Sequence, residues 1–515
     1  MRVFIENLCV RRIAAAIRRL GILRAARACG GALTLLLMSP SVAAVETPNI
    51  IWIIGEDLGP ELGCYGHPEV RTPNLDRLAS DGVRYTRAFT VAPVCSASRS
   101  AFVTGMYQTS IGAHNHRSHR DDGFQLPSGV RVITDWLRDA GVYTANVRQL
   151  SMDPKEPFFR GTGKTDWNFA YTGRPFDSDR WDDLKSHQPF YAQINFSETH
   201  RGSDWNRAHL DVAKPADPAK VQLPPYYPDH PEVRADWAQY LNAVMALDKK
   251  VGYVLDRLEA DGLADRTVVV FLGDHGRAMI RGKQWPYDSG LHIPLIIRWP
   301  KAIPVPSQFK PGTVNGQLIA SIDLAATTLA IAGVPPPLTM QGRVFLGAGA
   351  GPERKHVFGG RDRGDETVDR IRTVRTKRYR YLKNFYPEQP FLQLNRYKEF
   401  SYPVISLMRD LHARGELNAT QARLLAPTRP AEELYDLEAD PFETNNLADA
   451  AENQETLRTL RSVLESWIVE SNDQGRVAES AEIHEQWEAQ MKANYDEKIR
   501  DRDLRLHRVV PTPLP

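Results

Sequence analysis

Short apolar runs along the chain predict strands that are buried on both faces. Three of these runs are rich in β-branched residues and span residues 47–55, 267–273 and 295–300. Continuous runs of this kind are typical of parallel sheets, in which helices cover both faces. A fourth strand is expected in the segment 132–147, where a helical pattern is followed by Gly141 and a second apolar run.

Apolar residues at helical spacing alternate with these strands. Leu75 and Leu78 predict a short helix that Gly82 ends. Strands alternating with helices over about 300 residues predict a doubly wound α/β domain. The strongest amphipathic pattern lies in residues 236–258 and places these side chains on one face: Trp237, Leu241, Val244, Leu247, Val251, Val254 and Leu258.

Shifts in composition predict four segments. The glycine-rich stretch 347–356 marks a boundary, after which short strands and a helix at 452–470 are expected. Six prolines between Pro215 and Pro231 predict a surface loop or lid. The predicted segments are a leader at 1–44, a large α/β domain at 45–350, a smaller α+β subdomain at 351–472, and a polar, exposed helix and tail at 473–515.

The leader resembles an export signal. An apolar stretch, GGALTLLLM, is followed by small residues suited to cleavage near Ala43 or Ala44. This stretch is shorter than the roughly 20 residues that span a bilayer, so a stable membrane anchor is the less favoured interpretation. We expect a periplasmic or secreted protein, and the paired arginines leave twin-arginine export open. The arginines that precede the apolar stretch are Arg11, Arg12, Arg18, Arg19, Arg24 and Arg27.

Composition narrows the picture further. The chain is 42% hydrophobic and 25% charged, with a formal net charge of +2, which gives no clustered basic excess for nucleic-acid binding. Cys9 and Cys29 leave with the leader, so the mature chain keeps Cys64 and Cys95. Export permits disulfides, and a bond between these two cysteines is one interpretation.

Acidic residues follow two of the predicted strands. Glu56-Asp57 comes directly after the first, and Asp274-His275 comes after the run at 267–273. Ligands of open α/β sheets bind outside the carboxyl ends of the strands, where these side chains could hold a divalent cation. Carboxylates favour Ca²⁺ or Mg²⁺, whereas the imidazole of His275 also suits Zn²⁺ or Mn²⁺. Helix N-capping is the competing role.

Cys95 and Arg99 are four residues apart in PVCSASRSAFVTG (93–105). The small residues around them suit a loop that enters a helix, on which both side chains would share one face. Thiols at helix N-termini beside a cation are reactive, so Cys95 is a candidate nucleophile or modification site. A buried free cysteine without a chemical role is the alternative.

This segment also resembles the signature of the sulfatase family, cysteine-x-(proline or alanine)-serine-arginine followed by threonine-glycine. Further blocks resemble the family in order: NIIWIIGEDLG (49–59), FSETHRG (196–202), FLGDHG (271–276) and ELYDLEADPFETNNLA (433–448). The resemblance covers about residues 47–470 and is greatest to the heparan N-sulfatase (sulfamidase) branch. It implies an alkaline-phosphatase-like α/β fold, with a large, mostly parallel mixed sheet flanked by helices and a C-terminal α+β subdomain.

The resemblance also implies roles for individual residues. In the family the cysteine at position 95 becomes Cα-formylglycine, whose hydrate attacks sulfur, and the arginine at position 99 holds it. Asp274 would accept a proton from the nucleophile, and His200 and Lys283 would bind sulfate and protonate the leaving group. The implied cation, Ca²⁺ or else Mg²⁺, Mn²⁺ or Zn²⁺, would be bound by Glu56, Asp57, Cys95, Asp274 and His275.

Two departures from the family pattern affect these expectations. Glu56 stands where the family usually has aspartate. His275 stands where asparagine is common in the family. The glycine-lysine-x-histidine block is expected late, at GTGKTDWNF (161–169), after an insertion at 148–160. Lys164 then matches the substrate-binding lysine, and Asp166 replaces the histidine that would help to release sulfate.

The loop GAHNHRSHR (112–120) is a candidate part of the substrate mouth. Asn115 and Arg117 would contact an anionic sugar there. A zinc site is a second interpretation, although the spacing of the three histidines fits no strong zinc motif, and a solvated loop is a third. The expected partners are a sulfated saccharide or other sulfate ester and a formylglycine-generating enzyme. The histidines are His114, His116 and His119.

Two other functions remain compatible with these residues. The same cation and basic side chains would suit a phosphodiester or phosphonate ester hydrolase of the same superfamily. The departures at Glu56 and Asp166 would also suit a protein that binds sulfated glycans without hydrolysing them.

Overall fold

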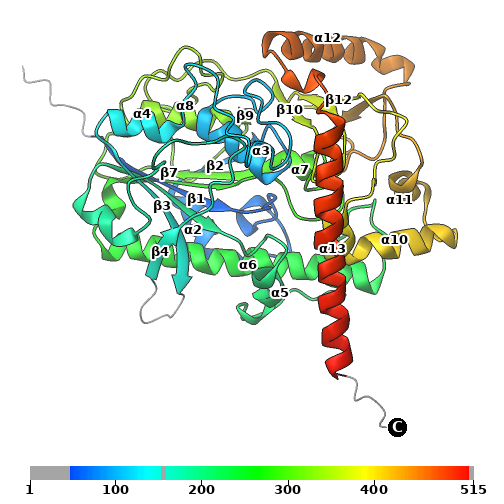
Figure 1. Cartoon of the computed structure of the whole chain (residues 1–515). Coiled ribbons are helices and arrows are strands. Elements are labelled where there is room, and N and C mark those ends of the chain that lie inside the picture. Colours follow the sequence, from blue (N-terminus) through cyan, green and yellow to red (C-terminus); the bar gives the residue numbers. More distant parts are fainter. Residues whose placement is uncertain (1–46, 152–157, 510–515) are drawn as a thin grey trace, which may run out of the picture. The chain divides into compact units, whose positions relative to one another are not determined.

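A mixed sheet forms the centre of the protein and contains all of the predicted strands of the large domain (Figure 1). The computed structural model describes residues 47–151 and 158–509, so the leader at 1–44 and residues 152–157 of the 148–160 insertion lie outside the described residues. The nine strands are β1 (Asn49–Gly55), β2 (Val83–Phe89), β3 (Tyr143–Ser151), β4 (Phe158–Thr162), β5 (Phe190–Phe196), β6 (Thr267–Gly273), β7 (His292–Arg298), β8 (Thr313–Asn315) and β9 (Ile319–Ala320).

The central strands run parallel and the antiparallel pairs lie further out. The order is β4-β3-β5-β1-β6-β7-β2-β8, with β9 beside β2. Strand β1 is parallel to both β5 and β6, whereas β7 is antiparallel to β6 and to β2. The α/β class with a mixed, mostly parallel sheet is therefore confirmed, and the run predicted at 295–300 begins three residues earlier, at His292.

Helices cover both faces of this sheet (Figure 1). Side chains of β1 alternate between the two cores, with Ile51 and Ile53 in one and Ile50 and Trp52 in the other. The first core is covered by α2 (Pro73–Asp81) and α6 (Pro231–Ala260), and the second by α3 (Cys95–Thr104), α4 (Ile133–Asp139) and α8 (Ile322–Ile331).

Helix α6 confirms the amphipathic pattern at 236–258, because all seven apolar residues predicted on one face are buried. The helix starts earlier than predicted, at Pro231, where the fixed φ of proline suits the first turn. The imidazole of His230 accepts a hydrogen bond from the backbone N–H of Glu232 and caps this end. The proline-rich stretch before it contains no strand, as expected for a loop.

A second, antiparallel sheet follows, in the order β10-β11-β12-β13. Its strands are β10 (Val357–Arg361), β11 (Ile371–Arg375), β12 (Tyr379–Asn384) and β13 (Glu432–Asp436), and α12 (Gln454–Glu470) packs on it. Both sheets belong to one compact unit, so the boundaries at 350 and 472 stay predictions. The remaining α-helices are α5 (Ser203–Arg207), α7 (Asp288–Leu291), α9 (Arg396–Ser401), α10 (Pro403–Ala413), α11 (Ala419–Ala422) and α13 (Ala481–Val509).

Within the described ranges, no helix has both the length and the hydropathy that crossing a bilayer requires.

Trp52 connects the central strand to the helix that carries Cys95. Its buried ring lies edge-on to Phe102 of α3 at 5.8 Å between ring centroids, and to Tyr191 of β5 at 5.4 Å. The indole N–H also donates to Thr328 Oγ1 of α8 at 3.2 Å. This one side chain therefore fixes α3 against the sheet.

We expect Trp52→Ala to lower the free energy of unfolding by about 3–5 kcal/mol, because it leaves a large cavity between β1 and α3. Denaturation in urea, followed by circular dichroism, measures this. Leu338→Ala is the control, because Leu338 is fully exposed and its truncation should change stability by less than about 0.5 kcal/mol. Equal effects of the two variants would contradict the structural role of Trp52.

Candidate active site

The register of β1 and β6 brings the predicted acids together. Gly55 lies opposite Gly273, so the residues that follow both strands leave the sheet at the same edge. The backbone N–H of Asp57 donates to Asp274 Oδ1 at 2.8 Å. A Cβ atom at Gly273 would lie 2.5 Å from the carbonyl oxygen of Leu58. The close approach of these two backbone segments therefore requires glycine at position 273.

Helix α3 adds Cys95 at its first residue. The Cys95 Sγ lies 3.2 Å from His275 Nε2 and 3.6 Å from Asp57 Oδ1. Ser98, one turn further on, donates its hydroxyl to the carbonyl oxygen of Asp274 at 2.5 Å and so ties the helix to the end of β6. Ligand atoms of four buried residues, Asp57, Cys95, Asp274 and His275, lie within 4.8 Å of one another.

The chemistry of this cluster fits a divalent cation. Two buried carboxylates would repel each other without compensating positive charge. The Nδ1 of His275 is 2.8 Å from the carbonyl oxygen of Gly276, which fixes the ring so that Nε2 faces the cluster. Two carboxylate side chains and one imidazole nitrogen are a donor set that Ca²⁺, Mg²⁺, Mn²⁺ or Zn²⁺ can accept.

Glu56, the fifth predicted ligand, lies outside the four-residue cluster. Its Oε2 accepts a hydrogen bond from Lys164 Nζ at 2.7 Å instead. Lys164 thus lies beside Glu56, and its match to the family lysine stays a prediction. Asp166 pairs with Lys164 at 3.8 Å and with Arg120, so it belongs to the same charged group.

Three cations surround the cluster: Lys164, Arg99 and Lys283. Arg99 donates from Nε to Asp274 Oδ2 at 3.1 Å and from Nη1 to Asn195 Oδ1 at 2.8 Å. Its buried Nη2 has no hydrogen-bond partner within the described part of the chain, and is therefore available to an anion. Lys283 Nζ donates to both carboxylate oxygens of Asp57, at 2.8 and 3.1 Å.

Burial and neighbouring charges set the protonation of the side chains around the cluster. Burial opposes the charged form of Lys164, yet negative charge at Cys95 and Glu56 raises the pKa of this lysine. The charge of Lys283, together with burial, lowers the pKa of His200, so its imidazole is neutral at neutral pH. The site thus combines fixed cations with an uncharged imidazole at His200.

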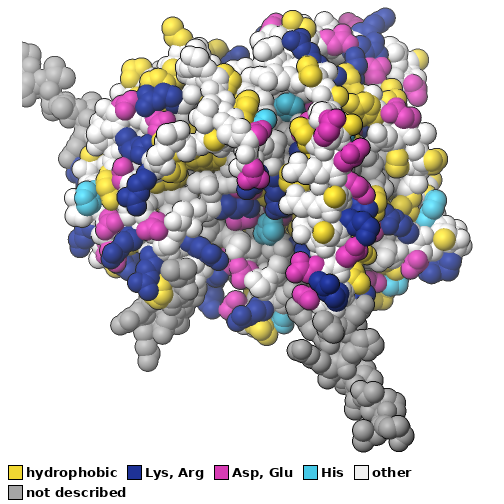
Figure 2. Space-filling model, viewed as in Figure 1, with side chains coloured by type: hydrophobic (Ala, Val, Ile, Leu, Met, Phe, Trp, Pro, Cys, Tyr) yellow, Lys and Arg dark blue, Asp and Glu magenta, His cyan; other side chains and the backbone are white. Residues whose placement is uncertain are grey.

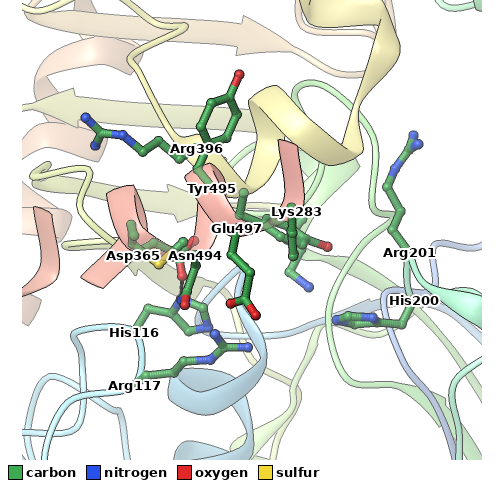
Figure 3. Close-up of a pocket in the computed structure, with 13 residues that line it drawn as sticks. His116, Arg117, His200, Arg201, Lys283, Asp365, Arg396, Asn494, Tyr495 and Glu497 are labelled. Carbon is green, nitrogen blue, oxygen red and sulfur yellow. Dashed lines mark ion pairs between the residues drawn. The ribbon is translucent and has the colours of Figure 1, made fainter. Parts of the chain in front are cut away.

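A pocket of about 300 Å³ opens beside the cluster (Figure 3). Lys283, His200 and Arg117 line it, and their roles in binding sulfate or substrate stay predictions. In the space-filling view, basic and histidine side chains gather in a hollow at the middle of this face (Figure 2). Asn115 does not line this pocket, because its side-chain oxygen accepts a hydrogen bond from the backbone N–H of Arg363 at 3.1 Å.

The three histidines of the 112–120 loop do not gather around a metal site in the part of the chain that the structure describes. His116 lines the pocket and pairs with Asp365 at 3.0 Å, and burial lowers the pKa of His116 to about 4. His119 pairs instead with the exposed Asp122. Cys64 and Cys95 are both free thiols, so the structure contradicts the disulfide interpretation.

Several residues of the pocket and of the surrounding hydrogen-bond network were not predicted from the sequence. Asp365 follows β10 in an irregular loop, where no pattern distinguishes it from other surface acids. Asn195, the partner of Arg99, stands at the end of the buried strand β5, and a polar residue in such a run is a signal that could have been used. Tyr397 of α9 and five residues of α13 also line the pocket: Met491, Asn494, Tyr495, Glu497 and Lys498.

Comparison with known proteins agrees with this geometry. The family model Sulfatase matches residues 48–334, more than half of the chain, and the model for the N-sulphoglucosamine sulphohydrolase C-terminal region matches residues 273–399. The chain belongs to the sulfatase family. It is thus a sulfuric ester hydrolase, and the fold class and the sulfamidase-like branch inferred from the sequence are confirmed.

Relatives of this sulfatase align along most of its length. An ulvan-active sulfatase of Formosa agariphila is 34% identical over 483 residues, covering 86% of this chain and 78% of the relative. Human N-sulphoglucosamine sulphohydrolase is 26% identical over 510 residues, covering 90% of this chain and 98% of the relative.

Solved structures share the fold of this sulfatase at lower identity. BT4656, in complex with its substrate D-glucosamine-2-N,6-O-disulfate, has a TM-score of 0.57 at 18% identity and covers 83% of this chain and 99% of its own. A phosphonate monoester hydrolase of Silicibacter pomeroyi has a TM-score of 0.55 at 20% identity and covers 83% of this chain and 96% of its own. The fold alone therefore does not separate sulfate from phosphonate chemistry.

The turn after Asp274-His275 leaves no room for a side chain at Gly276. The N–H of Gly276 donates to the carbonyl oxygen of Gly290 at 2.9 Å, and a Cβ atom would lie 2.2 Å from the carbonyl oxygen of Ser289. The loop that carries Asp274 and Lys283 is folded back on itself at this contact.

We expect Gly276→Ala to displace this loop and lower kcat/KM for 4-nitrophenyl sulfate at least about 100-fold, because small misplacements of catalytic groups are costly. Steady-state kinetics measures the effect, and far-UV circular dichroism shows whether the fold is retained. Gly351→Ala is the matched control, since nothing lies within 4 Å of its Cβ position. Unchanged kinetics for Gly276→Ala would show that the turn does not position the site.

Proposed function

We propose that this protein is a formylglycine-dependent sulfatase that removes sulfate from a sulfated saccharide. The observation that carries the proposal is the position of Cys95, at the start of α3 and 3.2 Å from His275 in a cluster of metal-type ligands. Oxidation of Cys95 to formylglycine would supply, as the aldehyde hydrate, one hydroxyl to attack sulfur and a second to release sulfate. A lone buried cysteine would need none of these neighbours.

A divalent cation, Ca²⁺ by our proposal, would be held by Asp57, Asp274, His275 and residue 95. When bound, it would supply charge stabilisation and lower the pKa of a coordinated hydroxyl. Carboxylates dominate the donor set, which favours Ca²⁺ or Mg²⁺. The imidazole of His275 also suits Mn²⁺ and Zn²⁺, so these two ions should be tested as well. Glu56 would join only if its carboxylate turned away from Lys164.

The surrounding cations would bind the sulfate oxygens. Arg99 offers its free Nη2, and Lys164 and Lys283 bring two further charges, so negative charge that develops on the sulfate is compensated. Asp274 would accept the proton of the attacking hydroxyl. His200 is neutral and lines the pocket, which suits hydrogen bonding to the sulfate or, with Lys283, proton transfer to the leaving group.

Asp166 is less suited to the proton-accepting role of the family histidine that it replaces. Burial opposes its charge, but Lys164 and Arg120 lower the pKa of Asp166, so the carboxylate holds protons weakly. We infer that Asp166 instead orients Lys164, which lies between Glu56 and Asp166. Arg117, on the pocket wall, would contact the sugar.

The relatives support a saccharide substrate that carries an O-linked or N-linked sulfate. The name of one relative contains ulvan, and the name of another contains N-sulphoglucosamine. The assay should therefore include both O-linked and N-linked sulfates. A panel of sulfated ulvan oligosaccharides, glucosamine-2-N-sulfate, 4-nitrophenyl sulfate and matched phosphate and phosphonate esters tests the proposal. Faster hydrolysis of the phosphorus esters, or binding without any hydrolysis, would overturn it.

The same proposal includes export and maturation. Removal of residues 1–44 would deliver the enzyme to the periplasm or the medium, where large sulfated saccharides are accessible. A formylglycine-generating enzyme would act on the CSASR segment that begins at Cys95.

Mass spectrometry of the purified, active enzyme should show formylglycine at residue 95 and a mature N-terminus near residue 45. We expect Cys95→Ala to abolish turnover and Cys95→Ser to fail in repeated turnover, because neither side chain offers a geminal second hydroxyl. Cys64→Ala is the matched control, since this free thiol is not among the cluster ligands of the described structure. Full activity with an unmodified thiol at residue 95 would refute the mechanism.

Removal of the metal should abolish activity. We expect about one Ca²⁺ per chain in the purified enzyme by elemental analysis, loss of activity after chelation, and recovery when Ca²⁺ returns. Asp274→Asn should lower the metal content, and added Ca²⁺ should raise the melting temperature of this variant less than that of the wild type. Asp256→Asn, at an exposed site, should change neither quantity. A metal-free enzyme with full activity would exclude the proposed cation.

A further inference from the structure

The C-terminal helix α13 forms one wall of the pocket, although the sequence predicts only an exposed polar helix there. It spans Ala481–Val509, beyond the residues 48–399 that the two family models match. Five of its residues line the pocket opposite the loop that carries His116 and Arg117 (Figure 3). The wall is therefore a feature of this chain outside the matched family regions.

Burial of apolar surface does not explain this placement. Of the residues of α13 whose side chains the structure describes, Met491 alone is buried. Helices that are polar on all sides gain little from core packing and need other contacts to hold them. The position of α13 over the pocket thus depends on specific polar and cation–π contacts.

Arg363 fixes both walls of the pocket. Its guanidinium pairs with Glu479, just before α13, at 2.5 Å and lies 4.7 Å from the ring of Trp487. The same guanidinium donates from Nη1 to the carbonyl oxygen of His116 at 3.2 Å. Further along the helix, Glu488 pairs with Arg396 of α9 at 2.6 Å. These contacts therefore hold α13 and the 112–120 loop in fixed positions relative to each other.

Two polar side chains of α13 face the pocket without a protein partner. Asn494 and Glu497, three residues apart, lie on the same side of the helix and extend toward His116 and Arg117 (Figure 3). No ion pair or hydrogen bond joins either side chain to another residue in the ranges that the structure describes. Both groups are therefore free to contact a ligand.

Arg117 presents a cation on the opposite wall, where burial opposes its charge, yet the carboxylates of Asp365 and Asp166 raise the pKa of its guanidinium. Its guanidinium makes no ion pair with any described residue, and its backbone has a φ of 57°, in the left-handed region that arginine rarely adopts. The N–H of Arg117 donates to Ser96 Oγ at 2.9 Å, beside Cys95, which holds the residue in this conformation. Strained residues of this kind are often kept for function.

We propose that Asn494 and Glu497 determine substrate specificity by hydrogen-bonding hydroxyl groups of the saccharide that carries the sulfate. A carboxylate accepts hydrogen bonds from sugar hydroxyls, and an amide both donates and accepts. Arg117 then binds an anionic group of the same sugar from the other wall. The inference rests on the proposed saccharide sulfatase function and adds that α13 supplies the selectivity for a sugar over a small aryl sulfate.

The test compares Glu497→Gln and Asn494→Ala with wild-type enzyme in the mature, formylglycine-containing form. The substrates are 4-nitrophenyl sulfate and whichever saccharide of the panel above the wild type hydrolyses fastest. We expect kcat/KM for the saccharide, divided by that for the aryl sulfate, to fall about tenfold in each variant, mainly through KM.

Asp496→Asn is the matched control for Glu497→Gln. It neutralises the neighbouring acid on the same helix, but Asp496 pairs with Lys492 at 2.6 Å and does not line the pocket. In this variant, the ratio of kcat/KM for the saccharide to kcat/KM for the aryl sulfate should equal the wild-type ratio. A change in all three variants would indicate a general effect on the helix and would overturn the proposal.

The two proposals fail in different ways. An unchanged ratio in both pocket variants, with an active wild type, overturns the role of α13 and leaves the sulfatase mechanism intact. A wild type that hydrolyses 4-nitrophenyl sulfate but no saccharide overturns the saccharide substrate, and the role of α13 with it. A selective loss on the saccharide supports both.

Discussion

Strands β1 and β6 pair in parallel with Gly55 opposite Gly273, and the candidate active site depends on this register. Side chains alternate between the two faces of a strand, so a slip of one residue would exchange the two cores and separate Asp57 from Asp274. Alternating burial of Ile50, Ile51 and Trp52 in opposite cores prevents such a slip. Packing of the sheet thus determines where the acids meet.

Charge balance is the next requirement, because carboxylates buried at one point repel each other. Lys283 compensates Asp57, and Arg99 compensates Asp274 from a helix tied to the end of β6 through Ser98. These cations would also attract an anionic substrate. The same side chains therefore stabilise the folded cluster and prepare it for sulfate.

The pocket combines segments from distant parts of the chain. The 112–120 loop, the loop that carries Lys283 and helix α13 meet around one cavity, and Arg363 connects the first of these with the start of the last. The cluster of metal-type ligands lies within residues matched by the sulfatase family model, whereas α13 lies outside them. The proposed catalytic cluster and the proposed sugar-binding residues of α13 thus lie in different regions of the chain.

The sequence by itself predicted part of the fold and a candidate site chemistry. Local patterns in the sequence indicate the predicted buried strands, the amphipathic helix at 236–258, the acids after the strands and the Cys95 motif. Such patterns can be recognised without knowing which residues are in contact. Only the tertiary structure decided that Glu56 pairs with Lys164, that Asn115 holds Arg363 and that Asp365, Asn494 and Glu497 face the pocket. The reason is physical: these placements depend on long-range packing between segments 108 or more residues apart in the two pairs, for which a local sequence pattern carries no signal.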